Sequence, residues 1–147
     1  MVNYDLREKS SMNIESKKIS INTPAKAVYD FVSSFNNFSR LVPSQIEGWQ
    51  STDDTCSFKV GGFMQIQLRM AEKTPYSKVV VAPDMQTASS FPFQLIVSMD
   101  EKNGSTDVVV SIKIEGNPMM LMMVKGKIKP ALDSLVEQLK YFVENKN

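Results

Sequence analysis

The side chains that most often carry out chemistry in proteins are scarce in this sequence. Histidine is absent from all 147 residues, which excludes Ser–His and Cys–His nucleophile pairs, histidine-ligated zinc and histidine-based pH sensing. Cys56 is the single cysteine, so it cannot form an internal disulfide. The sequence holds no phosphate-binding P-loop, no dinucleotide-binding glycine motif and no carboxylate cluster with metal-ligand spacing. We therefore expect no metal and no cofactor, and we assign no catalytic residue.

Tyr29, Arg40 and Tyr76 are the polar side chains that could reach the rim of a pocket. A cyclase or dehydrase site would need an acid or base held beside its substrate. The sequence brings no two of these three residues together, so an enzymatic role stays open but is less favoured than binding.

Methionine is the compositional outlier, with ten residues, four of them within residues 119–123. On a helix, Met119, Met122 and Met123 fall outside the apolar arc, and flexible methionine suits surfaces that accept varied apolar shapes. We expect an exposed patch beside a cavity mouth, or a partner or homodimer contact. The alternative is that a preceding loop buries this turn.

Three lysines follow the methionines, at positions 125, 127 and 129. They could serve as point charges for an anionic ligand. The simpler interpretation is a solvated face on which Lys129 pairs with Asp133, four residues on.

Charge and hydropathy limit the partners. The chain has 17 Lys and Arg against 16 Asp and Glu, so no net field attracts nucleic acid or an anionic membrane. Residues 1–11 are too charged for a signal peptide, and we expect them to be flexible or loosely packed. The longest apolar run, residues 119–124, is too short to span a bilayer. A cytoplasmic protein with no nucleic-acid partner and no membrane insertion is expected.

The order of elements is read from apolar periodicity and turn residues. Residues 12–21 predict a first strand, and Thr23-Pro24 predicts a helix that begins with Thr23 as N-cap. Asn36 or Asn37 should cap a second short helix that carries Phe38, Leu41 and Val42 and is ended by Pro43. Residues 45–115 then alternate apolar and polar positions, which predicts a six-stranded antiparallel meander. Asn117-Pro118 should start a final helix that runs to about residue 144.

Turn chemistry sets the register of the meander. Asn103-Gly104 predicts a two-residue type I′ turn, which pairs Lys102 with Ser105 and places Met99 opposite Val108. A three-residue loop at residues 61–63 pairs Cys56 with Leu68, and a four-residue loop at residues 74–77 sets Met70 opposite Val81. These registers give the sheet one apolar face and one mainly polar face, and the apolar arc of the final helix should cover the former.

Three segments carry a resemblance to a known superfamily: residues 19–25 followed by the helical residues 28–32, then residues 37–43, then residues 117–120. They resemble the START-like superfamily, which includes the birch pollen allergen and bacterial polyketide cyclase/dehydrase relatives. The likeness covers about residues 12–144 and indicates architecture rather than chemistry. It implies one START-like domain over residues 1–147, with an α+β helix-grip fold. In that fold a curled seven-stranded antiparallel sheet wraps around a long C-terminal helix, with an internal cavity between them.

The expected cavity lining combines the apolar face of the sheet with the arc of the final helix. The lining residues are Phe58, Met64, Ile66, Leu68, Met70, Phe91, Phe93, Leu95, Val97, Val110, Ile112, Met120, Val124 and Ile128. A core packed solid by its phenylalanines is the alternative. We expect the mouth to lie between residues 83–90, the Gly61-Gly62 hairpin and the first turns of the final helix.

The preferred function is that of a binding or carrier protein for a small hydrophobic or amphipathic molecule. Two alternatives are a polyketide cyclase/dehydrase-like enzyme and a protein-interaction module that uses the methionines at residues 119–123.

Overall fold

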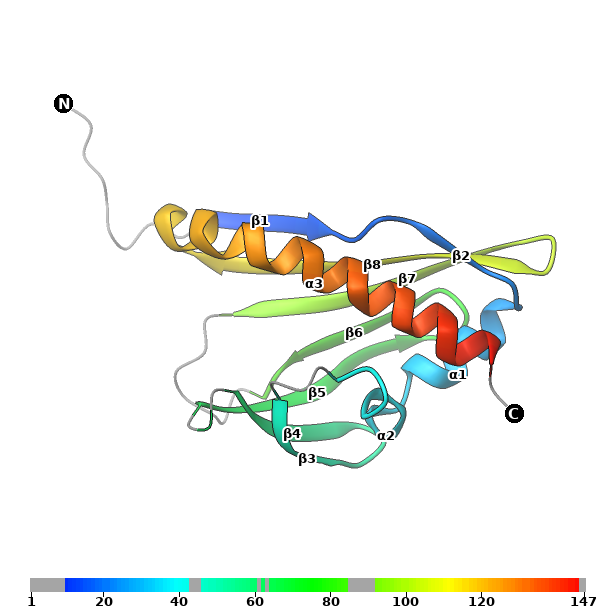
Figure 1. Cartoon of the computed structure of the whole chain (residues 1–147), viewed down its shortest axis with the longest axis horizontal. Coiled ribbons are helices and arrows are strands. Elements are labelled where there is room, and N and C mark those ends of the chain that lie inside the picture. Colours follow the sequence, from blue (N-terminus) through cyan, green and yellow to red (C-terminus); the bar gives the residue numbers. More distant parts are fainter. Residues whose placement is uncertain (1–9, 43–45, 61, 63, 85–91, 146–147) are drawn as a thin grey trace.

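The computed structural model describes residues 10–42, 46–60, 62, 64–84 and 92–145. Two strands, β1 (Ser10–Glu15) and β2 (Ile19–Ile21), precede two short helices, α1 (Ala25–Val32) and α2 (Phe35–Phe38). The remaining strands are β3 (Ile46–Ser51), β4 (Thr55–Val60), β5 (Met64–Thr74), β6 (Lys78–Pro83), β7 (Phe93–Lys102) and β8 (Ser105–Gly116). The long helix α3 (Pro118–Glu144) follows and lies along one face of the sheet (Figure 1).

The strands form one antiparallel sheet with the order β1-β8-β7-β6-β5-β4-β3, and β2 pairs with β8 beside β1. Helix α3 packs against β8, β1, β2 and α1, so it covers one side of the inner face. The core lies between these layers and includes Val108 and Val110 of β8 and Val136 of α3, all fully buried. This architecture confirms the expected α+β helix-grip fold.

The β7–β8 hairpin has the predicted register. Asn103 and Gly104 both have positive φ, 55° and 82°, as the two central residues of a type I′ turn require. Lys102 pairs with Ser105, and the inward pairs are Met99 with Val108, Val97 with Val110, Leu95 with Ile112, and Phe93 with Ile114.

The β4–β5 and β5–β6 hairpins have the predicted strand pairs, but the turn between β5 and β6 differs from its prediction. Cys56 pairs with Leu68, as predicted; Gly61 and Phe63 of the intervening loop lie outside the described residues. Met70 also faces Val81, but the connecting loop has three residues rather than four, because Thr74 pairs with Lys78. A register shift between Met70 and Glu72 absorbs the difference.

The predicted first strand is wrong in one respect, because it is two strands. Both pair with β8, which raises the expected seven strands to eight. Ser16 lies at the break: its N–H donates to the Val110 carbonyl (2.7 Å) and its Oγ accepts from the Val110 N–H (2.9 Å). The side chain thus replaces a ladder bond where the backbone leaves the sheet. Strand β1 begins at Ser10, so residues 10 and 11 of the segment expected to be loose belong to the sheet.

Both short helices begin at other residues than predicted. The N-cap of α1 is Pro24, not Thr23, and the Ala25 N–H donates to the Glu101 carboxylate of β7 (2.7 Å). A distant acid therefore caps this helix, which local sequence could not reveal. The N-cap of α2 is Ser34, whose hydroxyl accepts from the Asn36 N–H, rather than Asn36 or Asn37.

Helix α3 matches its prediction at both ends. The Asn117 side chain accepts from the Met120 N–H (2.8 Å), and Pro118 opens the helix. Leu121 is buried against the sheet, whereas Met119, Met122 and Met123 are exposed, as expected from their spacing. The predicted ion pair of Lys129 with Asp133 is present at 3.0 Å.

Candidate functional site

The inner face of the sheet is only partly covered. Helix α3 packs over β8, β1 and β2, while the inner face of β5 lies to the side of these contacts. Ile66, Leu68 and Met70 point to the inner face by register, yet they are only half-buried. Solvent therefore reaches apolar side chains that a closed core would bury completely.

The residues expected to line a cavity fall into three groups. Phe58, Val97 and Val110 are buried in the core. Half-buried positions are Ile66, Leu68, Met70, Phe93, Leu95, Ile112, Met120, Val124 and Ile128. Phe91 lies outside the described residues, and Met64 is placed in β5 opposite Val60 without a described side chain.

A groove opens between the middle of α3 on one side and residues 40–42 and Ile46 on the other. Its volume is about 920 Å³, against about 250 Å³ for a hollow on the outer face of the sheet. Leu132, 5% exposed, forms its floor. The other apolar lining residues are Leu41, Val42, Ile46, Ala131 and Leu135, and the polar ones are Arg40, Lys127, Ser134 and Gln138. An apolar floor with a polar rim is the usual composition of a small-molecule site.

The groove differs from the sequence prediction in its position. Of the expected lining residues that the structure describes, none contributes to it. The expected mouth includes residues 85–90, 61 and 63, which lie outside the described residues. Sequence reasoning missed the groove because Leu41 and Val42 were assigned to a second helix, whereas that helix ends at Phe38. Arg40, which we expected at a pocket rim, does line the groove.

Ionisable side chains are few on the described inner face. Register places Cys56, Lys73 and Glu101 there. Lys73 pairs with Asp54, and Glu101 is held by the α1 N-terminus. Burial raises the pKa of the Cys56 thiol to about 12, against a smaller opposing effect of a hydrogen bond with the Leu68 backbone. Cys56 is therefore a neutral thiol at physiological pH.

Trp49, the single tryptophan of the chain, is an aromatic residue beside the inner face that the sequence analysis does not single out. It comes from β3 and stacks on Phe58, with ring centroids 5.5 Å apart and planes at 16°. The indole Nε1 is buried and has no hydrogen-bond partner among the described residues. A buried donor without a partner is uncommon and costs free energy, so it could be satisfied by a bound acceptor.

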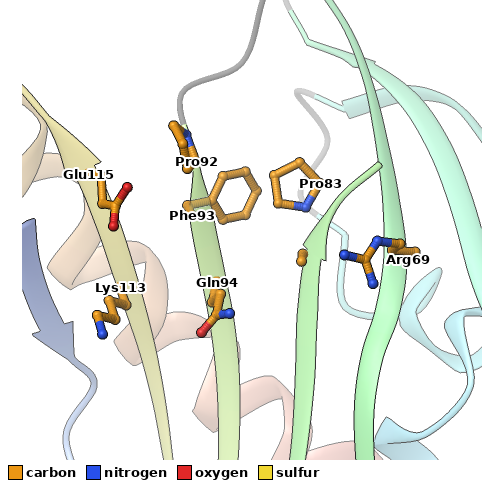
Figure 2. A pocket seen from close by; sticks show the side chains of 8 residues that line it. Arg69, Pro83, Pro92, Phe93, Gln94, Lys113 and Glu115 are labelled. Carbon is orange, nitrogen blue, oxygen red and sulfur yellow. The ribbon is translucent and has the colours of Figure 1, made fainter. Parts of the chain in front are cut away.

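The hollow on the outer face has a different character (Figure 2). The ring of Phe93, which we expected to line the inner cavity, instead points toward Pro83 in this hollow, with Arg69 on one side and Lys113 and Glu115 on the other. These charged groups stand at opposite rims and do not converge on one point. The hollow is thus a weaker candidate than the groove beside α3.

The two tyrosines expected at a rim come together elsewhere. Tyr29 of α1 and Tyr76 of the β5–β6 turn form an edge-to-face pair with ring centroids 5.6 Å apart. Neither contributes to the groove that Arg40 lines. Hence the three polar rim candidates do not form a catalytic group.

The described residues offer neither a metal-binding cluster nor a membrane-spanning helix. They contain no cluster of three or more Cys, Asp or Glu side chains arranged to hold a metal ion. None of the described helices is long and apolar enough to cross a membrane.

Comparison with solved structures identifies the fold. Norcoclaurine synthase from Thalictrum flavum, in complex with dopamine and hydroxybenzaldehyde, superposes with a TM-score of 0.73 at 9% identity, over 95% of this chain and 90% of that one. A START superfamily protein from Mycobacterium smegmatis gives a TM-score of 0.70 at 17% identity, over 92% and 99% of the two chains. A Chromobacterium violaceum protein gives 0.66 at 10% identity, over 92% and 98%.

Sequence comparison adds nothing to this: no family model matches the chain, and no curated protein matches it. At these identities the structural likeness concerns the fold alone. The chain has the START-like α+β helix-grip fold, which it shares with norcoclaurine synthase and with the START superfamily protein.

Proposed function

We propose that the protein binds a small hydrophobic or amphipathic molecule between its sheet and α3, and that it acts as a carrier. The observation that carries this proposal is the groove of about 920 Å³, with its apolar floor and polar rim. A solved structure of similar fold holds the small aromatic molecules dopamine and hydroxybenzaldehyde, which supports a ligand of that size. The proposal treats residues 1–147 as a single START-like domain located in the cytoplasm.

The ligand would lie with its apolar part on Leu41, Ile46 and Leu135, which are half-buried without a ligand. Its polar end would face Arg40 and Lys127 at the rim, where both side chains are exposed. The two cations favour a carboxylate, sulfonate or phosphate at that end. Deeper apolar contacts would come from the half-buried inner face of the sheet, which we retain as the inner wall of the site.

Binding is favoured over catalysis by the chemistry of the described inner face. Cys56 is held as a neutral thiol, and Lys73 and Glu101 are engaged by Asp54 and the α1 N-terminus. None of these groups is paired with another to form an acid and base around a common substrate position. Hydrophobic burial can supply the affinity without such a pair.

Fluorescence titration with anilinonaphthalene sulfonate, an aromatic anion, tests the proposal. We expect saturable binding at one site, with displacement by decanoate. Leu135→Asn should weaken binding roughly tenfold, because it replaces an apolar contact worth about 1.4 kcal/mol. Tyr141→Asn, at a 60% exposed position on the same helix, is the matched control and should leave affinity unchanged. Binding that is unsaturable, or equally weakened by both substitutions, would contradict a site in the groove.

A further inference from the structure

The first half of α3 carries a large apolar surface that no described part of the chain covers. The side chains of Met119, Met122 and Met123 are 76%, 75% and 72% exposed. Their i, i+3 and i+4 spacing places them in one stripe, on the opposite side of the helix from buried Leu121. The next residues along this stripe, Gly126 and Pro130, are also exposed and add no charge. Packing of α3 on the sheet therefore does not explain the methionines.

Positive charge surrounds this stripe. Lys125, Lys127 and Lys129 are all exposed, and residues 117–132 include neither Asp nor Glu. Lys129 pairs with Asp133, whereas Lys125 and Lys127 form no ion pair among the described residues. The positive end of the helix dipole lies at the same end of α3, whose first turn has no acidic residue to offset it. The net charge of +1 for the whole chain conceals this local asymmetry.

The exposed methionines and the lysines around them together indicate what kind of partner binds this face of α3. A second copy of the chain, placed face to face, would bring six lysines together, and like charges oppose that contact. An anionic partner would contact the same face without this repulsion between lysines. Exposed apolar side chains beside lysines are the pattern of helices that lie at a lipid–water interface. Methionine, which is unbranched and flexible, can enter the irregular boundary between headgroups and acyl chains.

We propose that the methionine–lysine face, formed by Met119, Met122, Met123, Lys125, Lys127 and Lys129, docks the protein on the surface of an anionic lipid bilayer. The methionines enter the headgroup region while α3 stays packed on its sheet. The lysines contact lipid phosphates and carboxylates. The groove begins on the same helix at Lys127 and continues to Gln138, so docking would bring its opening close to the bilayer. This inference does not depend on what the groove binds.

Vesicle co-sedimentation tests the docking surface. The full chain should bind vesicles of phosphatidylcholine with phosphatidylserine, bind phosphatidylcholine alone weakly, and lose the anionic component of binding as salt is raised. Lys125→Gln/Lys127→Gln should weaken binding to the anionic vesicles by roughly tenfold or more. Met122→Ser/Met123→Ser should weaken binding to both kinds of vesicle. Lys59→Gln/Tyr141→Ser changes exposed residues elsewhere and is the matched control.

Several outcomes would overturn the proposal. They are absence of wild-type binding to anionic vesicles, equal loss in the control variant, and full binding by either face variant. Sedimentation equilibrium tests whether a second copy of the chain occupies this face instead. A wild-type dimer that becomes a monomer in Met122→Ser/Met123→Ser would show that it does. Because the substituted side chains are exposed, circular dichroism should show all variants folded.

Discussion

The indole ring of Trp49 stacks on the ring of Phe58, with centroids 5.5 Å apart, and its buried N–H has no hydrogen-bond partner among the described residues. The two rings come from neighbouring strands, β3 and β4. Trp49 falls within the register shift between Glu47 and Gln50, so its stacking on Phe58, rather than a strand pair, places the indole beside the inner face.

Trp49→Phe should remove the donor and keep an aromatic ring at this position. We expect wild-type protein to bind 2-acetylnaphthalene more tightly than naphthalene, because only the ketone offers an acceptor. The ratio of the two affinities should be roughly tenfold, corresponding to one hydrogen bond. In Trp49→Phe the ratio should fall to about one, while any packing loss affects both probes alike. Calorimetry measures both proteins; an unchanged ratio in the variant would show that the indole N–H does not contact the ligand.

Ser16→Ala should destabilise the sheet where β1 gives way to β2. The substitution removes the acceptor of the buried Val110 N–H, and an unsatisfied buried donor costs about 1–3 kcal/mol. Urea denaturation would show this as a lower midpoint with an unchanged slope. Ser20→Ala, at an exposed position of β2, is the control and should change the free energy of unfolding by less than about 0.5 kcal/mol. Equal effects of the two substitutions would contradict the role of the Ser16 hydroxyl.

The Cys56 thiol should be unreactive in the folded protein. Burial raises its pKa to about 12, so the thiolate that attacks disulfide reagents is nearly absent at pH 8. Titration with Ellman's reagent should give no rapid reaction in buffer and one thiol per chain in denaturant.

The raised pKa of Cys56 also means that the stability of the fold falls as pH rises above about 9, because the thiol of the unfolded chain ionises first. Cys56→Ala should remove the part of the stability loss at alkaline pH that this thiol causes. Rapid labelling of Cys56 in the native protein would refute the prediction that the thiol is unreactive.

Acidification should weaken the attachment of α3 to the first strands. The pKa of Asp133 is lowered, chiefly by the Lys17 backbone N–H and then by Lys129; that of Glu144 is lowered by the Asn22 N–H and then by Lys140. Both carboxylates bind fewer protons in the folded state, so their stabilisation is present at neutral pH. It is lost as pH falls through the lowered pKa values.

Asp133→Asn therefore should make stability less dependent on pH in the acid range. NMR titration of the wild-type carboxylates gives a direct test, and Asp133 should titrate below its ordinary value of 3.8. An Asp133 that titrates at or above 3.8 would contradict the contact with Lys17.

The predictions that were confirmed rest on short-range rules. Asn103-Gly104 tolerates positive φ at both positions, and a two-residue turn then fixes every later pair of β7 and β8. Asn117 and Pro118 act within one helical turn, so the start of α3 could also be predicted. In each case the residues that decide the structure are close together in the chain.

The predictions that were wrong concern positions where a group far away in the chain makes the hydrogen bond or strand pair that was expected from a neighbouring residue. Glu101 caps α1, although it follows Ala25 by 76 positions, and this moves the N-cap from Thr23 to Pro24. Ser16 bonds to Val110, 94 positions away, and lets one predicted strand become two. The register shift between Met70 and Glu72 likewise depends on the pairing with β6. Local sequence propensity cannot predict these interactions, because their partners lie far away in the chain.

The sequence by itself determined the order of elements, the apolar face of the sheet, the stripe of α3 and the exposure of Met119, Met122 and Met123. All of these follow from periodicity, because side chains repeat every two residues on a strand and about every 3.6 on a helix. Only the tertiary structure decided where the fold stays open. Helix α3 settles over β8, β1 and β2, so the groove forms beside it, between Leu135 and Ile46, from segments far apart in the chain. Such a gap depends on how layers pack against each other, which no single stretch of residues specifies.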